Sequence, residues 1–125
     1  MKKLMAVLAA GVLIQGCLGG GASVYPDTDV IEPKDFGDPK VAQGISKSGG
    51  VMHAGSLEYS GAGELVQVYR EYVAAMKSQG WTGAADDIQG TKAVGTLRKD
   101  NRTCALEFTS SAGTIKVTIK INQTK

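Results

Sequence analysis

The chain has 125 residues, 42% of them hydrophobic and 21% charged, which suits one small globular domain with additional segments. Its 14 basic and 12 acidic residues give a formal net charge of +2. Lys2 and Lys3 account for that excess, so the rest of the chain holds 12 residues of each sign. A neutral chain argues against a nucleic-acid partner, because nucleic-acid-binding proteins present a basic surface.

The amino-terminal residues have the organisation of a secretory signal. Lys2 and Lys3 give a short positive start, and residues 4–14 form an apolar run. A membrane-spanning helix needs about 20 apolar residues, so this run is too short to cross a bilayer and is typical of a signal peptide. Residues 1–16 are therefore predicted to be an export signal that is removed from the mature protein.

The exit of this signal, residues 13–17 (LIQGC), resembles the lipobox of bacterial lipoproteins. Ile14 is the aliphatic residue three positions before the cysteine, and Gly16 is the small residue directly before it. The resemblance implies cleavage between Gly16 and Cys17, a diacylglycerol on the Cys17 thiol and an acyl chain such as palmitate on the new amine. Two or three acyl chains hold a protein firmly on a bilayer.

The resemblance also implies a location in the cell envelope. Leu18 follows the cysteine, where Asp would favour retention at the inner membrane, so we expect the outer membrane, facing the periplasm. An ordinary signal cleavage near Ala22 would instead leave a soluble protein with an unmodified Cys17.

Residues 17–50 are predicted to be the lipid anchor and a flexible tether, because they hold a glycine run and three prolines and show no helical or strand period. A flexible segment of this length spans about 30 Å. Residues 17–39 hold five acids and one base, whereas residues 40–125 hold eleven bases and seven acids. These opposite net charges could draw the two parts together or attract a partner, although a solvated linker is the simpler interpretation.

Residues 51–125 are predicted to be the folded domain, with a first strand inside 51–60 and a helix over 63–79. The helix is indicated by four apolar side chains at spacings of four, three and four residues, which form one face. They are Leu65, Tyr69, Tyr72 and Met76. Gly80 suits the left-handed conformation after the last turn, so that Trp81 folds back onto the helix in a Schellman motif.

The remaining chain reads as a three-strand meander over 91–99, 103–109 and 114–121, after a glycine-rich, acidic loop over 82–90. A turn at residues 100–101 pairs Leu97 with Cys104, and a loop over 110–113 pairs Phe108 with Ile115. All the apolar side chains then share one face, as a correct register requires. The lysines of the last strand are expected to protect a sheet edge.

These elements predict an α+β fold: an antiparallel sheet of about four strands with one amphipathic helix on one face, in the order β-α-β-β-β. The domain resembles small strand-helix-meander domains of secreted and lipid-anchored bacterial proteins. One helix covers only about half of such a sheet, so the remainder of that face is left to bind something or to pair with a second copy.

No catalytic constellation is recognised. His53 is the single histidine, no G-x-S-x-G, C-x-x-C or H-E-x-x-H motif occurs, and Cys104 alternates with apolar residues as a buried strand residue does. We therefore expect that the protein is not an enzyme and binds no metal and no cofactor. Tyr69, Tyr72 and Trp81 are the candidate ligand-facing residues, although Trp81 also suits the core.

The sequence thus predicts a non-enzymatic accessory or interaction module, held on the membrane by lipid on Cys17 and contacting a protein partner in the envelope. The alternative is a periplasmic carrier with a small-molecule pocket between the helix and the sheet.

Overall fold

The computed structural model describes residues 23–124, so the predicted signal, Gly16 and Cys17 lie outside the described residues. One helix and eight strands form within this part of the chain. They are β2 (Ser23–Val24), β3 (Ile31–Glu32), β4 (Val41–Ser48), β5 (Val51–Ala62), α2 (Leu65–Ser78), β6 (Thr82–Ile88), β7 (Lys92–Lys99), β8 (Arg102–Ser111) and β9 (Thr114–Gln123).

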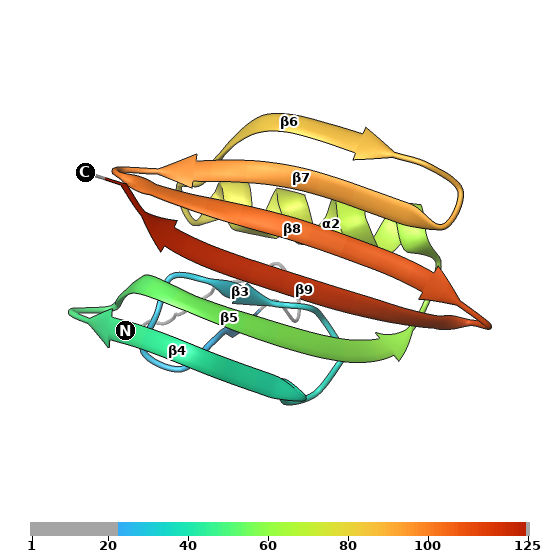
Figure 1. Cartoon of the computed structure of the whole chain (residues 1–125), viewed down its shortest axis with the longest axis horizontal. Helices are drawn as coiled ribbons and strands as arrows, with labels where there is room; N and C mark the ends of the chain where they lie inside the picture. The colour runs from blue at the N-terminus through green and yellow to red at the C-terminus, as the bar shows by residue number, and fades with distance from the viewer. Residues whose placement is uncertain (1–22, 125) are drawn as a thin grey trace, which may run out of the picture.

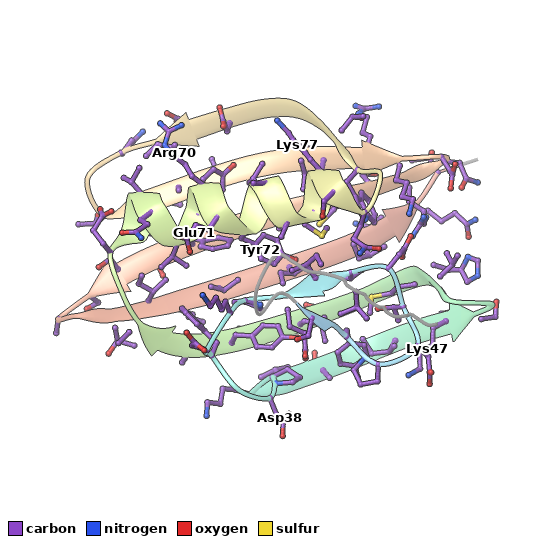
Figure 2. All side chains as sticks on the ribbon, turned by 180° about the vertical axis from the view of Figure 1, so that it is seen from behind. Asp38, Lys47, Arg70, Glu71, Tyr72 and Lys77 are labelled. Carbon is purple, nitrogen blue, oxygen red and sulfur yellow. The ribbon has the colours of Figure 1, made fainter. Side chains whose placement is uncertain are left out.

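Six strands form one antiparallel sheet in the order β4-β5-β9-β8-β7-β6, and β2 pairs with β3 in a short ribbon. Helix α2 and the ribbon lie beside each other on one face of the sheet, which we call the inner face (Figures 1 and 2). The opposite face, called the bare face, is uncovered by any element among residues 23–124. The predicted class, an antiparallel sheet with one helix on one face, is confirmed, whereas the count of about four strands and the order β-α-β-β-β are wrong.

Helix α2 forms as its apolar spacing predicts. Leu65, Tyr69, Tyr72 and Met76 are its buried residues, and the Glu64 carboxylate caps the amino end by accepting from the Val66 and Gln67 amides. At the other end Gly80 has φ +96°, its N–H donates to the Lys77 carbonyl, and the Trp81 N–H donates to the Met76 carbonyl. These two bonds are those of a Schellman motif, which confirms the predicted helix stop.

The meander is confirmed in its first register and shifted in its second. Leu97 pairs with Cys104, as the turn at residues 100–101 predicts. Phe108 pairs with Val117 instead of Ile115, because the turn is the two-residue Ala112–Gly113, in which both residues have positive φ. A shift of two residues keeps every side chain on its predicted face, so the core is the same.

Two segments predicted as irregular supply the extra strands. Residues 82–90 contain β6, an edge strand that pairs with β7 through its backbone and has an irregularity between Gly83 and Ala85. Strand β4 forms the other edge. Strand β9 lies in the middle between β5 and β8, so its lysines project from the bare face and do not protect an edge.

The prediction of a flexible tether over 17–50 is wrong for its described part. Residues 23–36 cover the half of the inner face that α2 leaves open, and Val30, Ile31 and Phe36 belong to the buried core. Phe36 lies so close to β5 that a Cβ on Gly61 would be 2.7 Å from its ring. An uncovered apolar half-sheet is unfavourable in water, and the chain's own amino-terminal segment removes it from solvent.

Candidate functional site

Two features of the inner face organise the site: a buried ionic cluster at one end of the sheet, and a groove between the amino-terminal segment and helix α2.

The ionic cluster is centred on the Asp29 carboxylate, which is 7% exposed. Arg102, at the start of β8, donates to both carboxylate oxygens, with distances of 3.0 Å from Nη1 to Oδ1 and 2.9 Å from Nη2 to Oδ2. Lys99 Nζ lies 2.9 Å from Oδ2, and the Met52 amide donates to Oδ1 at 3.4 Å. We call Asp29, Lys99 and Arg102 the Asp29 cluster.

Trp81 forms one wall of the Asp29 cluster. Its indole N–H donates to the Asp29 carbonyl at 3.0 Å, and the Arg102 guanidinium lies over its ring at 4.9 Å from the centroid. Trp81 is 1% exposed. The indole therefore links the helix end to the amino-terminal segment, and its ring face is occupied by Arg102 rather than open to a ligand.

The electrostatics of this cluster favour the ionised pair. Burial by itself raises the pKa of the Asp29 carboxyl, but the hydrogen bonds from Arg102 and Lys99 outweigh burial and hold that pKa well below its usual range. The hydrogen bond to Asp29 likewise raises the pKa of Arg102. A bidentate carboxylate–guanidinium pair fixes orientation as well as distance, so the cluster clamps residues 23–36 onto the sheet.

The sequence contained two signals for this cluster. Arg102 is in phase with Cys104 and Leu106 along β8, so it faces the core side of the strand. The opposite net charges of residues 17–39 and 40–125 were the second signal. In the structure, Asp29 of the acidic part forms ion pairs with Lys99 and Arg102 of the basic part.

The groove, with a volume of about 610 Å³, lies between residues 31–36 and α2. Its apolar walls come from both elements and are formed mainly by Ile31, Pro33, Phe36, Val68, Tyr72 and Ala75. Its charged lining residues are Glu32, Asp35 and Glu71 against Lys34, a net of −2. Figure 2 shows Glu71 and Tyr72 on the side of the helix that faces the ribbon. This volume lies within the range of small-molecule sites, and the groove is partly open to solvent.

Tyr72 supplies the buried side of the groove. Its hydroxyl is buried and has no hydrogen-bond partner among residues 23–124, and burial raises its pKa well above the usual value. Tyr72 is therefore positioned by its packing on Phe108, at 5.6 Å between ring centroids, and not by a polar contact within the described chain.

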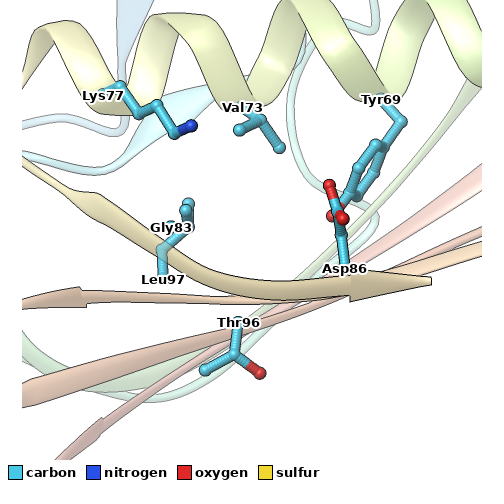
Figure 3. A pocket seen from close by; sticks show the side chains of 7 residues that line it. All are labelled: Tyr69, Val73, Lys77, Gly83, Asp86, Thr96 and Leu97. Carbon is cyan, nitrogen blue, oxygen red and sulfur yellow. The ribbon is translucent and has the colours of Figure 1, made fainter.

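A smaller recess of about 180 Å³ opens on the other side of α2, against strand β6 (Figure 3). Lys77, Val73 and Tyr69 line it from the helix, and Asp86 lies beside the Tyr69 ring. Burial, with a smaller contribution from the Asp86 charge, raises the pKa of Tyr69 to about 12. This recess is smaller than the usual small-molecule site.

Apart from this recess, side chains fill the space between α2 and the sheet. Tyr69 meets the Phe108 ring edge-on at 5.2 Å, and Tyr69, Tyr72, Met76, Leu97, Leu106 and Phe108 are all part of one buried cluster. Of the three candidate ligand-facing residues, Tyr69 reaches the recess, Tyr72 reaches the groove and Trp81 lines neither.

The two other reactive candidates have structural surroundings. Cys104 is buried, as its alternation predicts, and burial raises the pKa of its thiol to about 12. A thiol with this pKa holds almost no thiolate at neutral pH. His53 is half-buried on β5, and its Nε2 lies 2.9 Å from Ser48 Oγ.

Within residues 23–124, no group of three or more His, Cys, Asp or Glu side chains is placed to hold a metal ion. No helix in the same part of the chain is long and apolar enough to cross a membrane. Comparison of the chain with protein-family models, with curated proteins and with solved structures finds no significant match.

Proposed function

We propose that this chain is an envelope lipoprotein, anchored in the outer membrane by lipid on Cys17, whose domain is a non-enzymatic accessory or interaction module facing the periplasm. The observation that carries the proposal is the lipobox-like LIQGC at residues 13–17, which follows a short apolar run. The folded domain begins by Ser23, so only residues 18–22 separate the acylated cysteine from the first strand.

Two features of the domain support a binding role over a chemical one. The Cys104 thiol is buried with a raised pKa, and the Asp29 carboxylate is committed to Arg102 and Lys99. Functional nucleophiles and bases are instead exposed in a cleft with pKa values near the working pH. The bare face, in contrast, is a surface of six strands that exposes charged side chains such as Lys92, Glu107 and Lys120.

A cellular experiment tests the anchor and the partner together. A photo-activated crosslinking residue replaces Thr118 on the bare face, in the wild-type background and in Cys17→Ser. The proposal expects membrane-bound protein that forms one discrete protein adduct, and a Cys17→Ser chain that is released into the soluble envelope fraction and loses the adduct. Wild-type protein that never forms an adduct from several bare-face positions would contradict the interaction role.

The alternative, a small-ligand carrier, is favoured by one observation, the volume of the groove beside Tyr72. This location differs from the predicted pocket between the helix and the sheet, where side chains leave only the recess of about 180 Å³. Titration of the soluble Cys17→Ser protein with an environment-sensitive apolar dye tests it. Saturable binding that Ala75→Trp abolishes and Ala105→Trp leaves unchanged would support a carrier; no saturable binding would remove it.

A further inference from the structure

The amino-terminal segment enters the fold on one defined face of the domain. Strand β2 lies in the layer that contains α2, and Ser23 pairs with Glu32, a residue that lines the groove. Both views show this layer on a single side of the sheet (Figures 1 and 2). The connection to Cys17 therefore leaves the domain from its groove side.

The connection is too short to leave the domain's orientation free. Six residue steps separate Cys17 from Ser23, and a fully extended chain of that length spans at most about 20 Å. Backbone layers that pack face to face lie about 10 Å apart, and the side chains of the bare face project beyond the second layer. Residues 26 and 27 contact Lys47 of β4, so the amino-terminal segment lies near the β4 edge. To bring the bare face to the bilayer, the connection would have to pass around that edge and cross the full thickness of the domain.

From these two observations we infer that the anchored domain contacts the bilayer surface through its groove side, with α2 and residues 31–36 toward the lipid and the bare face toward water. This inference rests on the proposed lipidation of Cys17. It names the membrane-facing surface, which the presence of a lipid alone does not.

The charges of the two sides indicate that the short connection, and not electrostatic attraction, sets this orientation. The groove carries three acids and one base. On the bare face, Glu58 and Glu107 are each within 3.6 Å of a lysine, Lys116 and Lys92 respectively. A negative lipid surface would not attract the groove side, so the orientation is expected on neutral vesicles and should be independent of salt.

Two alanines provide matched reporter positions. Ala74 is exposed on α2 and lines the groove, whereas Ala105 is exposed on β8 and projects from the bare face between Thr96 and Lys120. Lipid blocks Cys17 and burial protects Cys104, so Ala74→Cys and Ala105→Cys each present a single reactive thiol for a fluorescent label.

The experiment uses the lipidated mature protein, which begins at Cys17, on phosphatidylcholine vesicles that contain a headgroup-quencher lipid. The inference expects several-fold stronger quenching of the label at 74 than at 105. An insertion of about fifteen Gly/Ser residues after Gly21, which adds roughly 20 Å of reach, should bring the two values together. Equal or reversed quenching in the protein with its natural connection would overturn the orientation.

Vesicle flotation and the mass of the amino-terminal peptide show whether a negative quenching result refutes the orientation alone or the lipidation as well. Protein that floats with a lipidated Cys17 but shows equal quenching leaves the lipoprotein assignment intact and refutes the orientation. Protein that does not float, with an unmodified Cys17, refutes both.

Discussion

Replacing Asp29 by Asn tests whether the amino-terminal segment is held by its buried ion pair. The substitution preserves the shape of the side chain and removes its charge, which leaves Arg102, 3% exposed, without its bidentate partner. Breaking a buried pair from one side costs about 3–5 kcal/mol, because the remaining charge loses its buried counter-charge. Arg102 keeps a contact of 3.5 Å to Asp100, but that side chain is 75% exposed and its charge is screened by water. A solvated tether would instead make the pair a surface contact worth about 0–1 kcal/mol.

Asp27 provides the matched control. It lies two residues away, is paired with Lys47 at 3.8 Å, and its side chain is 87% exposed. Asp27→Asn should therefore change the free energy of unfolding by no more than about 0.5 kcal/mol. Urea unfolding of the soluble Cys17→Ser protein, followed by the fluorescence of the single tryptophan, Trp81, measures both variants.

A double-mutant cycle attributes the loss to the pair. Asp29→Asn combined with Arg102→Met should cost less than the sum of the two single substitutions, by about 1–3 kcal/mol. An Asp29→Asn protein that is within about 1 kcal/mol of wild type and indistinguishable from Asp27→Asn would show that the buried pair does not hold the amino-terminal segment on the sheet.

The same substitution changes the pH dependence of stability. The pKa of Asp29 is lowered in the folded state, so the unfolded state binds the proton more readily as pH falls. Its stabilisation is full above the ordinary pKa of about 4 and is lost as the pH falls from there toward the lowered value. In Asp29→Asn the free energy of unfolding should therefore fall less steeply as the pH drops below about 4. An unchanged decrease would show that other carboxyl groups cause it.

Three further predictions concern single side chains and are measured on the soluble protein. Gly80→Ala should cost about 1–2 kcal/mol in urea unfolding because φ is +96° there, whereas Gly90→Ala, in open space without positive φ, should stay within about 0.5 kcal/mol; equal effects would contradict the helix stop. Cys104 should react with a thiol reagent only as fast as the native protein unfolds, and rapid labelling would contradict its burial. Tyr72→Phe should leave the free energy of unfolding unchanged or raise it, because the Tyr72 hydroxyl lacks a partner among the described residues. Tyr59→Phe loses the 2.9 Å hydrogen bond to the Glu32 carboxylate and should cost about 1–2 kcal/mol. A larger loss for Tyr72→Phe than for Tyr59→Phe would contradict these hydrogen-bond assignments.

The parts of the fold that local rules determine could be predicted. The spacing of Leu65, Tyr69, Tyr72 and Met76 determines which side of the helix is buried, and Gly80 determines where the helix ends. The β7–β8 register followed from a two-residue turn and from small side chains opposite large ones. The β8–β9 register was shifted because Ala112–Gly113 turns with two residues, where a four-residue loop was expected.

The parts that depend on distant residues could not be predicted. Asp29 and Arg102 are 73 residues apart, and no local period marks a segment that is ordered by a buried pair and by scattered apolar side chains. Strand β6 was missed because an edge strand is held by backbone hydrogen bonds on one side, and its exposed residues Thr82, Asp86 and Asp87 give no apolar alternation. One wall of the groove is formed by residues 31–36, which were not predicted to fold onto the domain, so the groove was not predicted either.

The proposed function and the proposed orientation both depend on lipidation of Cys17, which intact-mass and peptide analysis of the protein extracted from host membranes can determine. Lipidation predicts an amino-terminal peptide that begins at Cys17 and carries the added mass of a diacylglycerol and an amide-linked acyl chain. A free thiol at Cys17 in exported protein, a cut near Ala22, or a full-length chain that retains Met1 would contradict it.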